Sequence, residues 1–71
     1  MSLAGKIEFI RNEIKDLMRE DVYVSVGIST GGFWVAQSST KFGSPINALG
    51  HDAERALDNL YNIVKERMTQ I

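Results

Sequence analysis

The spacing of the hydrophobic residues changes twice along this chain, and each change marks a border between two kinds of secondary structure. Between residues 3 and 18 the apolar residues recur at steps of four and three, as they do on one face of an α-helix. Over residues 22–28 they alternate with polar or small residues, which is the period of a half-buried β-strand. From residue 52 onward the helical spacing returns. The pattern predicts a helix at each end and strands between them.

Both predicted helices have a single apolar face. Ser2 and Asp52 precede these helices and have the side-chain oxygens that N-cap positions favour. In the first helix the apolar face is made of Leu3, Ile7, Ile10, Ile14 and Leu17, with Phe9 and Met18 beside it. In the last helix it is made of Ala53, Ala56, Leu57, Leu60, Ile63, Val64 and Met68. We therefore expect both helices to lay one side against a shared core.

Residues 22–38 predict a β-hairpin. Gly31 and Gly32 lie between its strands, and both can adopt the positive φ that a tight two-residue turn requires. Residues 33–38 then form the return strand. The face turned away from the helices would carry Tyr23, Ser25, Trp34 and Ala36.

Residues 39–50 are predicted to form a loop or a ragged strand end. The segment is largely polar and contains two glycines and the only proline of the chain. It is long for so small a domain, and long ordered loops often have a function. Its anchors to the core would be Phe42, Ile46 and Leu49.

Residues 1–71 are thus predicted to form one α+β domain with the order α-β-β-α. A two-stranded hairpin is marginally stable in water, and its open edges invite further pairing. With no cysteine and one histidine, neither a disulfide nor a usual structural zinc site can reinforce the small core. We therefore expect a two-fold homodimer with a four-stranded antiparallel sheet. The alternative is a monomer in which residues 39–49 cover the edge.

The composition argues against several classes of function. Eight Lys and Arg residues against nine Asp and Glu give a net charge of −1, so no strong field attracts nucleic acid or an anionic membrane. The apolar stretches are too short for a transmembrane helix, and the first residues lack the pattern of a secretory signal. We expect a cytoplasmic protein without cofactor or metal, which fits the absence of cysteine.

No group of residues in the sequence predicts catalysis. Histidine is the residue type most often used as a general acid or base, and we interpret the single histidine, His51, as an exposed residue before the last helix. Residues 29–32 have backbone N–H groups that could cradle an anion, but they lack the spacing and the lysine of a phosphate loop. We predict that the protein is not an enzyme.

The hairpin and the segment after it carry the residues that we predict to bind a partner. Tyr23 and Trp34 are expected on one exposed face, and aromatic residues are enriched at protein interfaces. The same rings could stack on nucleic-acid bases, so the alternative is a nucleic-acid-binding regulator that also uses the loop cations. In the first helix the cations are interleaved with acids, which indicates a solvated, salt-bridged face. The predicted partner-binding residues are Tyr23, Trp34, Ser38, Thr40, Lys41 and Phe42.

Residues 50–60 resemble the turn and helix that follow a β-hairpin in the HicB-type antitoxin family. The match consists of Gly50, Asp52, Glu54, Ala56, Leu57 and Asn59. The chain departs from the family pattern in having a helix before its hairpin. The resemblance implies a module that binds and blocks another protein. The sequence therefore predicts a small, non-enzymatic, homodimeric interaction module of the antitoxin-like or mobile-element accessory kind.

Overall fold

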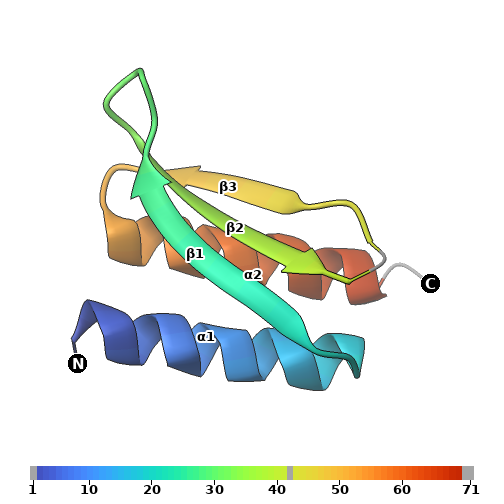
Figure 1. The fold of residues 1–71 in the computed structure, drawn as a ribbon. Helices are drawn as coiled ribbons and strands as arrows, with labels where there is room; N and C mark the ends of the chain where they lie inside the picture. The colour runs from blue at the N-terminus through green and yellow to red at the C-terminus, as the bar shows by residue number, and fades with distance from the viewer. Residues whose placement is uncertain (1, 42, 70–71) are drawn as a thin grey trace.

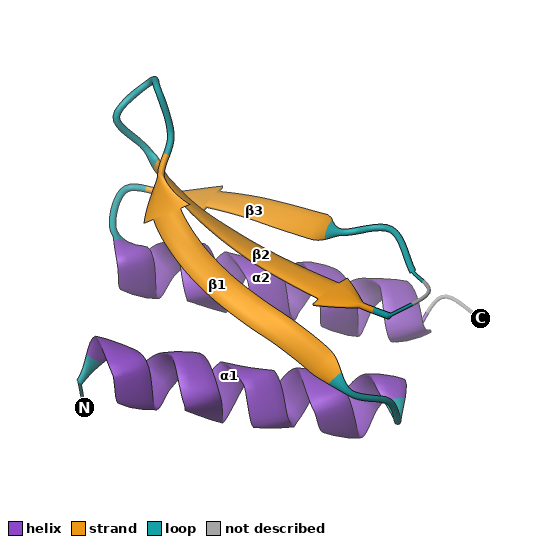
Figure 2. Cartoon of the chain, viewed as in Figure 1, coloured by secondary structure: helices purple, strands orange, loops and turns teal. Residues whose placement is uncertain are grey.

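The chain forms two layers, an antiparallel sheet and a pair of helices. The computed structural model describes residues 2–41 and 43–69. The sheet has three antiparallel strands in the order β1-β2-β3. Both helices lie against one face of the sheet, and no described element covers the other face (Figure 1, Figure 2). In chain order the elements are α1 (Leu3–Met18), β1 (Val22–Ile28), β2 (Trp34–Thr40), β3 (Ile46–Gly50) and α2 (Ala53–Thr69).

The first helix and the first strand begin and end where the hydrophobic periodicity places them. The Ser2 side chain caps α1 by accepting a hydrogen bond of 3.1 Å from the Gly5 N–H, as the sequence predicts. Arg19 caps the C-terminus of α1: its N–H donates to the Lys15 carbonyl at 2.7 Å, and its left-handed φ of 59° ends the helix. The chain can then turn back at once into β1.

A third strand occupies part of the segment that the sequence predicts to be a loop. β2 extends to Thr40, and β3 pairs with it antiparallel over Ile46–Gly50. The order is therefore α-β-β-β-α, and the predicted α-β-β-α order is wrong. The period of two is present in β3, where Ala48 is buried between the exposed Asn47 and Leu49. It is inconspicuous because only four residues separate Pro45 from Gly50, the glycine that closes the strand.

The hairpin loop between β1 and β2 has three residues rather than two. The Ser29 N–H donates to the Phe33 carbonyl at 2.7 Å, and the Gly32 N–H donates to the Ser29 carbonyl at 3.1 Å. The loop therefore consists of Thr30, Gly31 and Gly32, and of the two glycines only Gly32 has a positive φ, 83°. A type I turn followed by a left-handed residue is a common way to join antiparallel strands.

The extra loop residue decides which face of the sheet the side chains of β2 occupy. The register pairs Ile28 with Trp34 and Val26 with Ala36, so both residues of β2 point toward the helices. Ala36 is fully buried and Trp34 packs against the core, so the prediction that they face away from the helices is wrong. Side chains alternate along a strand, and a shift of one residue therefore moves a whole strand's side chains to the opposite face.

The core lies between the sheet and the two helices. Its centre contains the small residues Ala36, Ala48 and Ala56, which allow α2 to approach the sheet closely. Gly50 marks the closest approach, because a Cβ at this position would lie 2.8 Å from the Cα of Ala56. The buried hydrophobic residues are Ile10, Ile14, Val22, Ala36, Ala48, Ala53, Ala56, Leu57, Leu60 and Val64.

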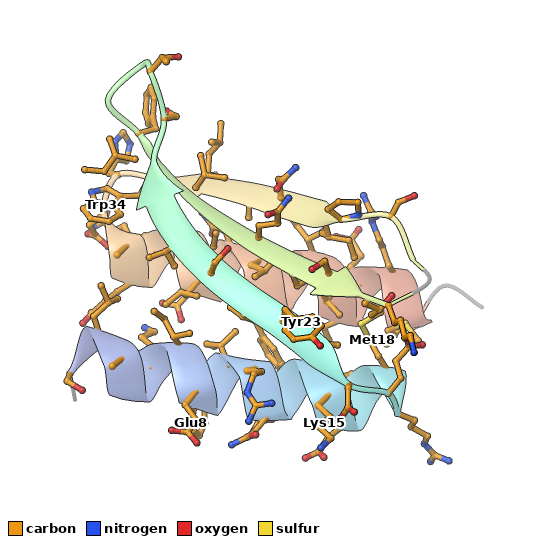
Figure 3. The ribbon with its side chains drawn as sticks, viewed as in Figure 1. Glu8, Lys15, Met18, Tyr23 and Trp34 are labelled. Atoms are coloured by element: carbon orange, nitrogen blue, oxygen red, sulfur yellow. The ribbon has the colours of Figure 1, made fainter. Side chains whose placement is uncertain are left out.

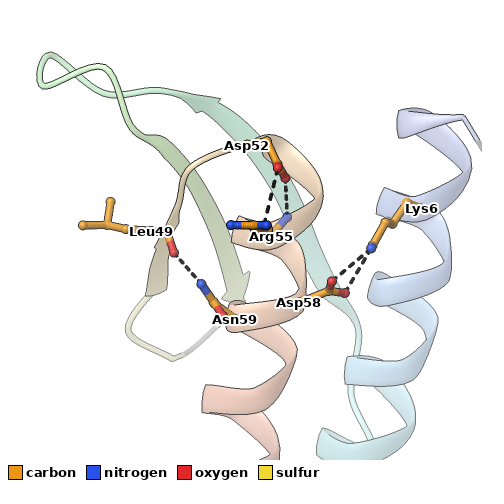
Figure 4. A network of polar contacts seen from close by, with 6 residues as sticks. All are labelled: Lys6, Leu49, Asp52, Arg55, Asp58 and Asn59. Carbon is orange, nitrogen blue, oxygen red and sulfur yellow. Dashed lines mark hydrogen bonds and ion pairs between the residues drawn. The ribbon is translucent and has the colours of Figure 1, made fainter.

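Polar contacts join α2 to α1 and to β3 (Figure 4). The Lys6 ammonium of α1 lies 3.0 Å from Oδ1 of Asp58 in α2. The Nδ2 of Asn59 in α2 donates to the carbonyl of Leu49 in β3 at 2.7 Å. Because Asp58 is more than half exposed, solvent screens its ion pair with Lys6 strongly. Apolar packing is therefore the main force that holds α2 in place.

Replacement of Gly32 by alanine should destabilise the hairpin, because a Cβ is strained at a φ of 83°. We expect Gly32→Ala to lower the free energy of unfolding by about 1 kcal/mol, measured by urea denaturation. The matched control is Gly31→Ala, in which the added Cβ would meet Phe33 at an ordinary 3.7 Å. This control should leave the free energy of unfolding nearly unchanged. Equal losses in both variants would show that the three-residue loop and its register are wrong.

Candidate functional site

The helices leave one side of the sheet uncovered by any described element, and we call this side the open face. Tyr23 at one end of it is 70% exposed, and Leu49 at the other end is 57% exposed. Polar residues lie between them, with Gln37 of β2 flanked by Ser25 and Asn47 in register. The open face as a whole consists of Tyr23, Ser25, Gly27, Val35, Gln37, Ser39, Asn47 and Leu49.

A hollow adjoins the Leu49 end of the open face. It has a volume of about 540 Å³ and lies between the hairpin loop, the end of β3 and the first turns of α2. The Phe33 ring forms one side of it and lies 5.6 Å from the His51 ring, centroid to centroid. Arg55 also borders the hollow, and its side chain is 68% exposed. The hollow therefore combines two apolar side chains, Phe33 and Leu49, with one exposed cation, Arg55, and one exposed carboxylate, Asp58.

The edge of the sheet at β3 is short and partly occupied. β3 has five residues, and Pro45 directly precedes it. Asn59 donates to the Leu49 carbonyl, so a side chain of α2 already satisfies one backbone acceptor of this strand. A proline beside a short strand hinders the addition of another strand, and so does a side chain that covers the edge.

The edge of the sheet at β1 has none of these protections. β1 has seven residues, without a charge or a proline, and it is the strand at the front of the sheet in Figure 1. Within residues 2–41 and 43–69, no side chain donates or accepts a hydrogen bond with the β1 backbone. Natural proteins usually protect such edges with charges, prolines, bulges or covering segments. β1 is therefore the edge of this sheet that is open to pairing.

The predicted partner-binding residues do not form one surface. Tyr23 lies on the open face, whereas Trp34 is half-buried on the helix side and lies at the opposite end of the sheet (Figure 3). Ser38 is also on the helix side and is only 3% exposed. The Thr40 hydroxyl accepts a hydrogen bond of 2.9 Å from the Gly43 N–H, which orders the turn after β2.

The last two predicted residues follow β2 directly. Lys41 is exposed and adjoins the turn after this strand. Phe42 lies outside the residues that the structure describes. The register turns Trp34 and Ser38 toward the helices, so the prediction that Trp34 shares an exposed face with Tyr23 is wrong. Tyr23 and Lys41 are accessible, as a binding role requires.

Leu49 lies on the open face, so the prediction that it anchors residues 39–50 to the core is wrong. Its side chain points to solvent, whereas Ile46, another predicted anchor of residues 39–50, packs against the core as predicted. The outward position of Leu49 follows from the alternation in β3, where Ile46 and Ala48 face the helices and Asn47 and Leu49 face away from them. Phe33, which is 43% exposed, extends the same apolar end of the open face and was not among the predicted residues either.

The described residues show no arrangement typical of catalysis. His51 is exposed, and its ring lies against the ring of Phe33. Over the same residues, no three His, Cys, Asp or Glu side chains converge to hold a metal ion. None of the described helices is long and apolar enough to cross a membrane.

The residues that carry the resemblance in the sequence form the junction between β3 and α2. Gly50 permits close packing, and Oδ1 of Asp52 accepts a hydrogen bond of 2.8 Å from the Arg55 N–H, as its predicted N-cap role requires. Leu57 is fully buried and Asn59 binds β3. No protein-family model matches the chain, and no curated protein matches it significantly.

The hydrogen bond from Asn59 to β3 should contribute measurably to stability. We expect Asn59→Ala to lower the free energy of unfolding in urea by about 1 kcal/mol more than Asn62→Ala does. Asn62 is a matched control because it lies exposed on the same helix, so both variants gain equally in helix propensity. If the two variants have the same stability, then Asn59 does not hold the β3 edge.

Proposed function

We propose that this protein is a non-enzymatic, homodimeric interaction module whose open face binds another protein. The observation that carries the proposal is a neutral, unprotected edge strand, β1, beside an uncovered face of the same sheet. One copy pairs with another through β1, and the joined sheet presents an enlarged open face to the partner. The resemblance of residues 50–60 to the HicB-type antitoxin family supports the same role, a module that binds and blocks a protein.

Pairing through an edge strand suits the physical state of this chain. A domain of this size buries a smaller share of its surface than a larger one, so it gains more from additional contacts. The addition of a second copy at β1 would satisfy the backbone groups of this edge and leave only β3 edges, which are short and partly covered. A two-fold pair is closed, so it does not continue into a fibre. Each copy contributes three strands, and the dimer sheet would have six.

The chemistry of the open face fits a protein partner. Tyr23 and Leu49 present large apolar surfaces at its two ends, and Gln37 provides an amide for hydrogen bonds between them. An aromatic ring and an aliphatic side chain around a polar centre are typical of protein interfaces. The net charge of −1 provides no field that would favour a polyanion.

The nucleic-acid alternative has lost the feature on which it depended. It required Tyr23 and Trp34 together on one exposed face, and the register separates them. In addition, Lys6 and Lys15 of α1 are engaged in ion pairs with Asp58 at 3.0 Å and with Asp21 at 3.2 Å. Within residues 2–41 and 43–69, Tyr23 and Trp34 therefore form no shared platform on which bases could stack, and the nucleic-acid-binding role is the less favoured proposal.

The proposed dimer can be tested by sedimentation. At micromolar concentration the protein should sediment at about twice the chain mass of 7.9 kDa. Ser25→Lys should give a monomer with an unchanged circular dichroism spectrum, because a lysine on an exposed edge strand opposes pairing. Asn47→Lys, which adds the same charge at the β3 edge, should remain a dimer. A wild-type monomer, or a Ser25→Lys dimer, would contradict pairing through β1.

The role of the open face can be tested by affinity capture with matched variants. A protein bound by the wild type should be lost with Leu49→Asp, because a charge would then replace an exposed apolar contact. It should be retained with Asn62→Asp, which places the same charge on α2, outside the open face. The purified pair should show the same difference in a direct titration. If the partner binds the Leu49→Asp variant as tightly as it binds the wild type, then it does not use the open face as proposed.

A further inference from the structure

We propose that β1 pairs antiparallel with β1 of a second copy in one register, with Ser25 opposite Ser25. This inference rests on the proposed dimer and specifies the geometry of its interface. It follows from the directions of the backbone groups, from the sequence of β1 on either side of Ser25, and from the lack of charged residues in the strand.

The hairpin fixes which residues of β1 can pair outward. Ser29 is bonded to Phe33 across the hairpin, and hydrogen-bonded pairs recur at every second residue of an antiparallel ladder. The odd-numbered residues of β1 therefore bond to β2. The N–H and C=O groups of the even-numbered residues point to the free edge. These outward residues are Val22, Val24, Val26 and Ile28.

The register centred on Ser25 is the one that uses the whole strand. Ser25 is the middle residue of Val22–Ile28, so every residue of β1 finds a partner in the second copy. On the helix side, Val24 lies opposite Val26, and Val22 lies opposite Ile28. These pairs join apolar residues, and Ile28, which is 67% exposed in the single chain, gains an apolar neighbour. A shift in either direction leaves residues at both ends unpaired.

On the open face, this register places Tyr23 opposite Gly27 of the second copy. Tyr23 is 70% exposed, and a Cβ built at Gly27 would have no atom within 4 Å. Glycine weakens the interior of a strand and often marks the close approach of another group. An aromatic side chain opposite a glycine on a neighbouring strand compensates for this weakness. The space above Gly27 thus fits the ring that the register places there.

The charges near the β1 edge are compatible with this pairing. β1 itself has no charged residue, so no like charges meet across the seam. The two-fold axis of an antiparallel strand pair is perpendicular to the sheet, which makes the two α1 helices antiparallel and keeps all helices on one face.

Oxidative cross-linking can test the register directly, because the chain has no natural cysteine. Residues opposite one another in a non-hydrogen-bonded pair have Cα atoms about 4.5 Å apart, within the range of a disulfide. Ser25→Cys should therefore cross-link to itself. Within a preformed dimer the effective thiol concentration is millimolar, so oxidation of micromolar protein should be about a hundredfold faster than between free chains.

Two further cysteine variants distinguish this register from its neighbours. Tyr23→Cys alone should not cross-link, because the two sulfur-bearing residues would be about 13 Å apart along the strands. An equimolar mixture of Tyr23→Cys and Gly27→Cys should yield the mixed disulfide. Asn47→Cys at the β3 edge is the matched control and should stay reduced over the same time.

The outcomes separate this inference from the proposed function. Rapid cross-linking of Ser25→Cys, with Asn47→Cys reduced, supports the register. The protein could instead sediment as a dimer in which Tyr23→Cys cross-links with Ser25→Cys while Ser25→Cys does not cross-link with itself. This result would overturn the register but not the dimer through β1. Cross-linking of Asn47→Cys would overturn both the register and the dimer through β1, because it would place the interface at β3. A protein that sediments as a monomer also removes the dimer on which the register depends.

Discussion

The structure depends on a one-sided core: two helices are available, and both pack against the same face of one sheet. Ala36, Ala48 and Ala56 lie at the centre of this core and are small enough to bring α2 close to the strands. The opposite face receives no cover from the described chain, and the outer strands keep unpaired edges (Figure 2). A larger domain would place further helices or strands there. We propose that this chain uses the same surfaces to bind other molecules.

The sequence predicts the parts of this fold that depend on long, regular periodicity. The bounds of α1 and β1 and the capping roles of Ser2 and Asp52 follow from it and are confirmed. The features that it misses depend on single residues. A loop of two or three residues fits Ser29–Gly32 equally well by composition, yet the choice decides whether Trp34 faces solvent or the helices. β3 was missed because five residues are too few to establish a period.

The same single-residue choice explains how far the candidate site could be predicted. Tyr23 precedes the loop, and its exposed position follows from the periodicity of β1 alone. Trp34 and Ser38 follow the loop, so the error in loop length placed them on the wrong face. Leu49 was assigned to the core because hydrophobicity alone does not show on which face of an unrecognised strand a residue lies. The difference between the two sheet edges was also hidden, since it depends on the contact of Asn59 with β3.

Hydrogen exchange of the β1 amides, measured by NMR at several protein concentrations, tests the central claim most directly. The amides of Val24 and Val26 point to the free edge, whereas those of Ser25 and Gly27 bond to β2. If β1 is a pairing edge, the Val24 and Val26 amides should be protected at high concentration and should exchange faster on dilution. The Ser25 and Gly27 amides should stay protected in the folded single chain. Rapid exchange of Val24 and Val26 at every concentration would contradict the account.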